Sequence, residues 1–173
     1  NPELFDLDDS GNPAHVAGVP PDYFSETGQR WGNPLYLWER MKKDDYLWWR
    51  KRILHLLNMV DVIRIDHFRG FEAFWQIPAA EETAVKGKWV KGPGKSFFGT
   101  MESYFGRLPV IAEDLGMITP EVDILKNSFN FPGMKILQFI FESMENEELL
   151  ETMSEENSCI YTGTHDNESI LGW

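Results

Sequence analysis

Hydrophobic positions gather in four short apolar segments, which are separated by longer stretches with helical spacing or with loop composition. The apolar segments are residues 59–66, 108–113, 134–141 and 158–164. Their shortness and their β-branched or apolar content are typical of buried strands. Near-continuous apolar strands that alternate with helices indicate a parallel sheet covered on both faces. The pattern therefore predicts an α/β fold.

Several segments between these strands carry helix signals. Residues 44–58 place Tyr46, Trp49, Ile53 and Leu57 at three- to four-residue spacing, behind an Asp at 44 or 45 that can cap the helix. Residues 97–105 and 119–125 predict two more helices, the second one starting with a Thr cap followed by Pro. Residues 142–157 hold seven Glu and no Lys or Arg, which predicts a solvated helix. Residues 71–77 predict one or two helical turns.

Two segments show neither the spacing of apolar residues typical of a helix nor that typical of a strand. In the first 35 residues Gly and Pro are interspersed throughout, which predicts a long loop. A loop of this length is usually functional or disordered, and its aromatic residues favour an ordered loop. Residues 86–95 predict a basic loop rich in Gly and Pro.

Composition and charge narrow the class of protein. The chain has 173 residues, with 16 Lys and Arg against 28 Asp and Glu, and a formal net charge of −12. That balance argues against nucleic acid and against an anionic membrane surface as partners. No apolar run reaches the roughly 18 residues of a transmembrane helix. A lone Cys159 suits a reducing compartment, so the cytoplasm is the expected location, with a plastid as the alternative. Aromatic residues make up 14% of the chain, which weakly favours carbohydrate chemistry.

Carboxylates follow three of the four predicted strands. In parallel α/β folds function collects at the carboxyl ends of the strands. The first strand ends in Asp66, the second in Glu113, and the fourth is followed by Asp166. A single Asp after a strand is most often a helix cap, but three acids at one edge favour a functional site.

Two carboxyl groups on either side of one bond is the arrangement that cleaves glycosides. One attacks the anomeric carbon or activates water, and an attacking carboxylate must stay ionised, which a neighbouring Arg enforces. Arg64 and Asp66 lie two positions apart and point to the same side of a strand. The other protonates the leaving oxygen, so it needs a drier or more negative environment. Glu113 follows three apolar residues and precedes Asp114, which fits that role.

The same residues resemble a known family. RIDHFRG at 64–70, AEDLG at 112–116 and THDN at 164–167 resemble the α-amylase clan in this order. The segment GVPPDYFSETGQRWGNPLY at 18–36 is similar to the signature loop of the 4-α-glucanotransferases, or amylomaltases, of glycoside hydrolase family 77. The resemblance extends over essentially the whole chain.

The resemblance implies a role for each strand-end residue. Asp66 is the expected nucleophile, and Glu113 is the expected general acid and then the base that activates the acceptor. Asp166 is expected to hold the 2- and 3-hydroxyls of the distorted sugar. Arg64 keeps Asp66 charged, and His165 is expected to hydrogen-bond near the same sugar.

The resemblance also implies substrate-binding positions outside these groups. The loop is expected to arch over the acceptor channel, with Trp31 as a stacking platform and Asp22 near the point of cleavage. The remaining substrate-binding candidates are Tyr23, Phe24, Gln29, His67 and Asn167. The expected partners are an α-1,4-glucan donor and a sugar acceptor, with no cofactor and no metal.

The implied fold is part of a (β/α)8 TIM barrel that covers about strands four to seven. Residues 1–36 are then an acceptor-side loop, and residues 37–173 are four strand–helix units of one catalytic domain. A full barrel needs about 250 residues, so the N-terminal and C-terminal barrel segments are expected to be absent from this chain and needed for activity. The alternatives are a related retaining hydrolase or phosphorylase, a non-catalytic glucan-binding module, or a barrel whose acids hold Mg²⁺.

Overall fold

The computed structural model describes residues 1–23, 25–143 and 156–173, and the chain divides into two units. The first consists of Asn1–Asn58 and Arg69–Leu108, and the second of Met59–Phe68 and Pro109–Trp173. Each unit is described by itself. Residues 144–155, which include most of the helix predicted at 142–157, lie outside the described residues.

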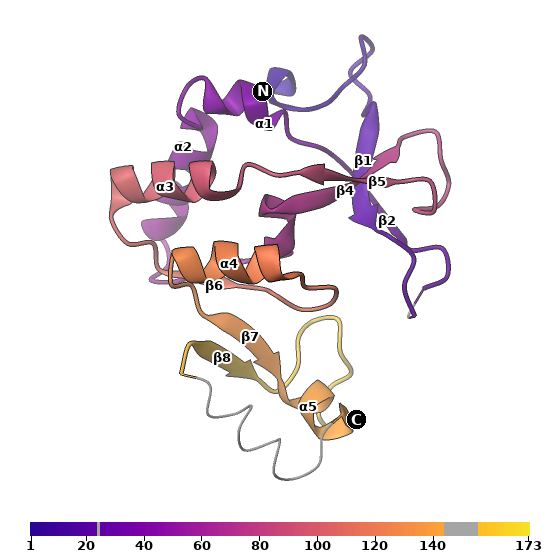
Figure 1. Ribbon diagram of the computed structural model, residues 1–173, viewed down its shortest axis with the longest axis vertical. Helices are drawn as coiled ribbons and strands as arrows, with labels where there is room; N and C mark the ends of the chain where they lie inside the picture. The colour runs from indigo at the N-terminus through magenta and orange to yellow at the C-terminus, as the bar shows by residue number, and fades with distance from the viewer. Residues whose placement is uncertain (24, 144–155) are drawn as a thin grey trace. The chain divides into compact units, whose positions relative to one another are not determined.

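The first unit contains a four-stranded antiparallel sheet that the sequence pattern did not predict. Its strands have the order β2-β1-β4-β5 (Figure 1). They are β1 His15–Val19, β2 Gln29–Pro34, β4 Ala73–Pro78 and β5 Lys88–Lys91. The predictions of a continuous loop over the first 35 residues, of helical turns at 71–77 and of a loop at 86–95 are therefore wrong.

The central pairing of this sheet joins β1 and β4, which are about sixty residues apart, so no local pattern indicates it. In the β1–β4 pair Val16 lies opposite Ile77, and the β4–β5 pair places Trp75 opposite Trp89. Val16 and Ile77 are buried in a small core with Ala84. The strands are short and contain few apolar residues, so apolar and polar positions do not alternate clearly along them. The sheet is thus stabilised by cross-strand pairs rather than by local propensity.

Gly18 in β1 is required by the close approach of its neighbours. A Cβ at this position would lie 2.1 Å from the backbone oxygen of Gln29 in β2 and 2.6 Å from a methyl group of Ile77 in β4. Because β2 backbone lies on one side of Gly18 and the core residue Ile77 on the other, the structure could not shift to make room for a larger side chain.

We expect Gly18→Ala to lower the free energy of unfolding by about 1–3 kcal/mol, measured by urea denaturation. The matched control is Gly99→Ala in helix α3 (Gly94–Phe105), where a Cβ would meet nothing within 4 Å. That change should cost nothing, because Ala is the better helix former. Equal destabilisation by both substitutions would contradict the packing argument.

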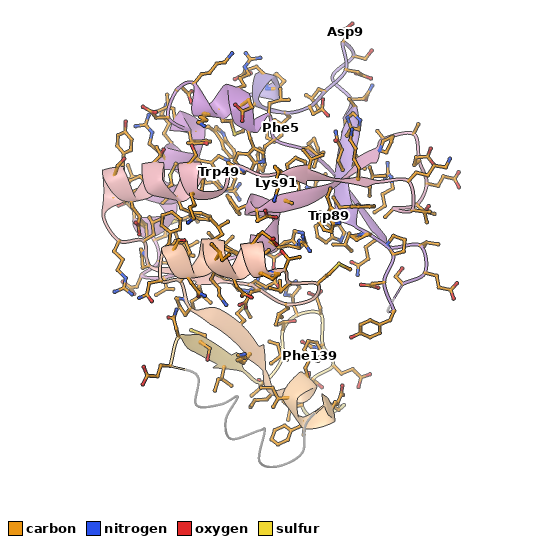
Figure 2. All side chains as sticks on the ribbon, viewed as in Figure 1. Phe5, Asp9, Trp49, Trp89, Lys91 and Phe139 are labelled. Atoms are coloured by element: carbon orange, nitrogen blue, oxygen red, sulfur yellow. The ribbon has the colours of Figure 1, made fainter. Side chains whose placement is uncertain are left out.

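Helices complete the first unit. They are the 3-10 turn η1 Pro2–Leu4 and the helices α1 Trp38–Lys42, α2 Leu47–Leu57 and α3 Gly94–Phe105. The predictions of α2 and α3 are confirmed, and the Asp44 carboxylate accepts the Leu47 N–H at 3.1 Å at the start of α2. An aromatic cluster joins these helices. It includes Trp49, which is labelled in Figure 2, and the centroid of its ring lies 5.4 Å from that of Phe97.

The second unit contains the four predicted strands, each shorter than expected. They are β3 Ile63–Ile65, β6 Val110–Ala112, β7 Gly133–Ile136 and β8 Ser158–Tyr161. β3 pairs with β6 and β7 with β8, both in parallel. Between the two pairs, the Ala112 N–H donates to the Pro132 carbonyl at 2.8 Å. The parallel pairing within each pair is what the sequence pattern predicted, but the described strands form two two-stranded sheets rather than the single parallel sheet expected.

The described residues of the second unit include two helices. The 3-10 turn η2 Phe68–Phe71 follows β3 at the point where the chain returns to the first unit. The helices are α4 Pro120–Ser128, which was predicted, and α5 Leu137–Ser143, which replaces the second half of the strand predicted at 134–141. Along α5, Gln138 and Ile140 are buried while Phe139 and Phe141 are exposed. That short alternation imitates a strand. Of the described helices, none has the length and apolar character needed to cross a membrane.

Candidate active site

The carboxyl ends of β3 and β6 form the framework of the candidate site. Their parallel ladder continues past the strands, because the Glu113 N–H donates to the Ile65 carbonyl at 2.9 Å and the Phe68 N–H donates to the Glu113 carbonyl at 3.0 Å. Asp66 and His67 therefore form a short excursion between two ladder positions. His67 has a φ of 48°, in the left-handed region that non-glycine residues rarely adopt. Such strain is common at functional sites.

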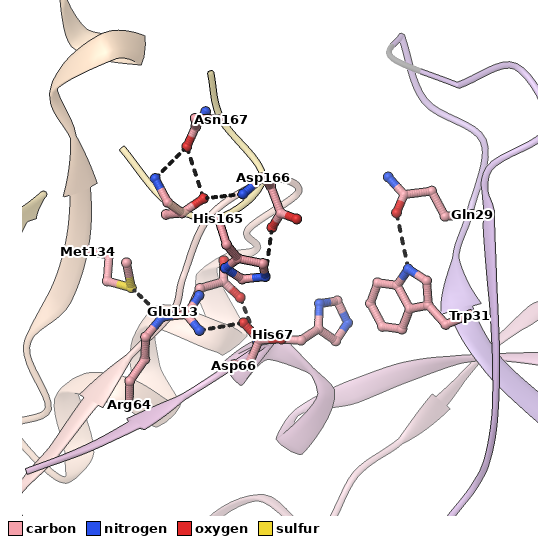
Figure 3. Close-up of polar contacts among 11 residues, drawn as sticks. Gln29, Trp31, Arg64, Asp66, His67, Glu113, Met134, His165, Asp166 and Asn167 are labelled. Atoms are coloured by element: carbon pink, nitrogen blue, oxygen red, sulfur yellow. Dashed lines mark hydrogen bonds and ion pairs between the residues drawn. The ribbon is translucent and has the colours of Figure 1, made fainter. Parts of the chain in front are cut away.

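Asp66 projects from this excursion beside a cation. Its Oδ1 lies 2.7 Å from Nη1 of Arg64, and its side chain is 69% exposed. Arg64 also donates from Nε to the Met134 sulfur at 3.3 Å (Figure 3). The arrangement places an exposed carboxyl group beside a guanidinium, at a position that a substrate can reach.

Glu113 occupies a different environment. Its Oε2 accepts the His67 N–H at 2.6 Å, and its Oε1 accepts the Leu115 N–H at 2.9 Å. Burial raises the pKa of Glu113, the two N–H donors oppose that rise, and the negative charge of Asp66 adds to it while Arg64 opposes it. Glu113 thus keeps its proton to higher pH than an ordinary carboxyl group, as a general acid must.

Asp166 lies in the loop after β8, and its side chain is 81% exposed, with Oδ2 3.5 Å from Nε2 of His165. Asn167 shapes this loop, because its Oδ1 accepts the Thr164 N–H at 2.8 Å and bonds the Thr164 hydroxyl at 2.9 Å. In Figure 3 the His165 ring points from the loop toward the side on which Arg64 and Asp66 lie.

The remaining substrate-binding candidates lie in the first unit. Asp22 accepts the Ser25 N–H at 2.9 Å and so closes a turn, and Tyr23 is almost fully exposed. Trp31, which is partly exposed, donates from its indole nitrogen to Oε1 of Gln29 at 3.1 Å. Phe24 lies outside the described residues.

Asp114 has a role that the sequence did not reveal. It is not a helix cap, because α4 begins only at Pro120. Instead its carboxylate pairs with Lys126 and accepts the Met134 N–H at 2.8 Å. The sequence shows its position next to Glu113, but no local pattern connects it with Lys126 or β7. Within the part of the chain that the structure describes, no three His, Cys, Asp or Glu side chains are grouped to hold a metal.

In this parallel α/β unit, a carboxylate paired with an arginine and a carboxyl group with a raised pKa lie at the ends of neighbouring strands. This pair of groups makes the protein a candidate glycosidase or transglycosidase. Comparison with known proteins specifies the family. The family model of glycoside hydrolase family 77, described as 4-alpha-glucanotransferase, matches residues 1–173. The chain belongs to this family.

Relatives and solved structures agree with this assignment. The chain is 54% identical over its full length to a 4-alpha-glucanotransferase of Thermus thermophilus, and covers 35% of that protein. It is 49% identical to the chloroplastic/amyloplastic 4-alpha-glucanotransferase of Solanum tuberosum, and covers 30% of it. The amylomaltase of Streptococcus agalactiae, solved in complex with acarbose, superposes with a TM-score of 0.92 over 99% of this chain and 35% of its own, at 45% identity. The chain thus spans about a third of the length of the curated relatives it matches.

Proposed function

We propose that the protein containing this chain transfers α-1,4-glucan segments between maltooligosaccharides or starch-like glucans by a retaining double displacement. The observation that carries the proposal is the contrast between two neighbouring carboxyl groups. Asp66 is exposed and paired with Arg64, while Glu113 is half-buried and has a raised pKa. Such a pair supplies a nucleophile and an acid at one site.

In the first step an Asp66 oxygen forms a bond to the anomeric carbon of the donor as the bond to the leaving oxygen breaks. Glu113 gives its proton to that oxygen, so the departing chain leaves as an alcohol. In the second step an acceptor hydroxyl forms a bond to the same carbon and releases the Asp66 carboxylate. The ionised Glu113 takes the hydroxyl proton and is ready for another cycle.

The other candidate site residues of the second unit would bind the donor sugar or support the residues that react with it. Asp166 is proposed to accept hydrogen bonds from the 2- and 3-hydroxyls, which strengthen as the ring flattens toward an oxocarbenium ion. His165 would contact the same sugar, and His67 and Asn167 would contribute to the neighbouring binding positions. Arg64 would keep Asp66 ionised until it attacks.

The first unit would favour transfer over hydrolysis. An acceptor held on aromatic side chains presents its hydroxyl at high effective concentration, and an ordered loop keeps water away from the intermediate. Trp31 is proposed as the stacking platform, with Asp22, Tyr23, Phe24 and Gln29 as further acceptor contacts. Since an α-1,4 bond is broken and an equivalent bond is formed, the net reaction redistributes chain lengths.

We propose that the full fold is a (β/α)8 barrel of which this chain supplies about strands four to seven, with residues 1–36 as an acceptor-side segment that carries β1 and β2, and with the strand–helix units lying within residues 37–173. The parallel pairs β3–β6 and β7–β8 support this, because such pairs are the repeating element of a barrel. The protein would act in the cytoplasm or, like the relative from Solanum tuberosum that is named as chloroplastic/amyloplastic, in a plastid.

The experiment that tests the function is incubation of the full-length gene product with maltotriose. We expect glucose and longer maltooligosaccharides to form while the concentration of reducing ends stays constant. A steady rise in reducing ends would identify a hydrolase instead. Absence of any product at high enzyme concentration would refute both activities.

The 173 residues alone should form almost no product, because a barrel site needs the binding residues of its other strands. The comparison is made at equal molar concentrations of the short chain and the full-length protein, again with maltotriose. Full activity of the short chain would contradict the proposed barrel.

A further inference from the structure

We propose that Asp114, held in place by Lys126, is a positioning residue that fixes both candidate catalytic carboxyl groups at once. The proposal rests on the proposed function, because it assumes that Asp66 and Glu113 react with a glycoside. All of the contacts that support it lie in the second unit.

Asp114 and Lys126 form an ion pair shielded from water. Their side chains are 11% and 14% exposed, and the Lys126 ammonium contacts the Asp114 Oδ2. Oδ1 of Asp114 accepts the Met134 N–H at 2.8 Å, so both carboxylate oxygens are engaged. Lys126 also lies 3.6 Å from Asp123, whose side chain is 51% exposed. A buried pair satisfied in this way strongly restricts the conformation of the segments that bear it, since breaking it leaves a buried charge.

Gly133 at the start of β7 is fitted to Asp114. A Cβ at residue 133 would lie 2.3 Å from Oδ2 of Asp114 and 2.9 Å from its Oδ1. Real Cβ atoms do not approach so closely, so any larger residue would displace the carboxylate. A side chain used only as a surface ion pair would not need such a cradle.

The first consequence concerns Glu113. The Glu113 backbone is hydrogen-bonded to Ile65 and Phe68 on one side. On the other side the next residue, Asp114, is hydrogen-bonded through its side chain to β7. The chain between them is thereby fixed, and it presents the Leu115 N–H to Oε1 of Glu113 at 2.9 Å.

The second consequence concerns Asp66. Met134, whose N–H is bound by Asp114, accepts the Arg64 Nε at its sulfur, and Arg64 in turn pairs with Asp66 at 2.7 Å (Figure 3). A displacement of Asp114 would therefore be transmitted to the nucleophile through Met134 and Arg64, and to the acid through the backbone.

The test compares Asp114→Asn and Gly133→Ala with two matched controls in the full-length protein. Asp123→Asn removes the exposed partner of Lys126, and Gly99→Ala adds a methyl group in open space. We expect kcat for maltotriose disproportionation to fall about 10²-fold in the first two variants, the effect of a misplacement of about 1 Å. KM should change little, and both controls should match the wild type.

Two readouts separate positioning from a general loss of structure. The alkaline limb of the pH profile of kcat/KM should shift upward in Gly133→Ala, because a weakened Leu115 donor leaves the Glu113 anion less stabilised. Hydrogen exchange of the peptide containing residues 113–116 should accelerate in Asp114→Asn and Gly133→Ala and stay unchanged in the controls.

Unchanged exchange in that peptide together with unchanged kcat in the folded variants would overturn the proposal. A loss of kcat with an unmoved alkaline limb and unchanged exchange would equally assign Asp114 a merely structural role. If the wild type lacks transferase activity, the proposed function fails, whereas the exchange measurement still decides whether Asp114 fixes residues 113–116.

Discussion

Replacement of Asp66 by Asn should lower the proposed transferase activity of the full-length protein by about 10⁴-fold or more. The expected loss is large because an amide cannot form the glycosyl ester on which the reaction depends. Folding should be almost unaffected, since the side chain is 69% exposed and an exposed pair with Arg64 contributes little to stability. Initial rates of glucose release from maltotriose measure the first effect, and the melting temperature measures the second.

The control for this substitution is Asp61→Asn, which makes the same chemical change at an exposed position just before β3. It should leave activity and melting temperature unchanged. A variant Asp66→Asn that is folded and keeps more than about a tenth of wild-type activity is incompatible with a role as nucleophile.

Replacement of Glu113 by Gln should lower the proposed activity with unactivated glucans by about 10²–10⁴-fold. The amide can neither protonate the leaving oxygen nor remove the proton of the acceptor. The wild-type kcat/KM should fall as pH rises through the raised pKa of Glu113, because the acid loses its proton there. This alkaline limb should be absent from the variant, and a pH profile over both proteins measures it.

Substrates that need no proton transfer should reverse the defect. Fluoride leaves a glycosyl fluoride without protonation, and azide attacks the intermediate without a proton to give up. With both, Glu113→Gln should approach the wild-type rate and yield a glycosyl azide, while Glu3→Gln at an exposed position behaves as wild type throughout. If the variant remained equally slow with fluoride and azide, Glu113 would have another role.

The sequence predicted those helices that are specified by neighbouring residues, through their first residues and the spacing of their apolar side chains. Asp44, which accepts the Leu47 N–H, and the spacing through Leu57 indicate α2, and Thr119 followed by Pro120 begins α4. The β1–β4 pairing at the centre of the antiparallel sheet has no such signal, because Val16 lies opposite Ile77, about sixty residues later. In α5 the apolar run hid the change from strand to helix, since burial alternates there as it does in a strand.

The same distinction applies to the candidate site. The two-residue spacing of Arg64 and Asp66 predicted their ion pair, and the apolar residues before Glu113 predicted its burial and raised pKa. The left-handed conformation of His67 and the cradle that Gly133 forms for Asp114 depend on the meeting of β3, β6 and β7. No pattern along the chain could have shown them.

The most direct test of the account is to trap the covalent intermediate on the full-length Glu113→Gln variant. A glycosyl fluoride supplies the donor without needing the acid, and the missing base slows release of the intermediate. After digestion, mass spectrometry should find the glycosyl group on the peptide that contains Asp66, joined through its carboxylate. A glycosyl group on any other residue, or turnover of the fluoride with no adduct formed, would contradict the assignment of Asp66 as the nucleophile.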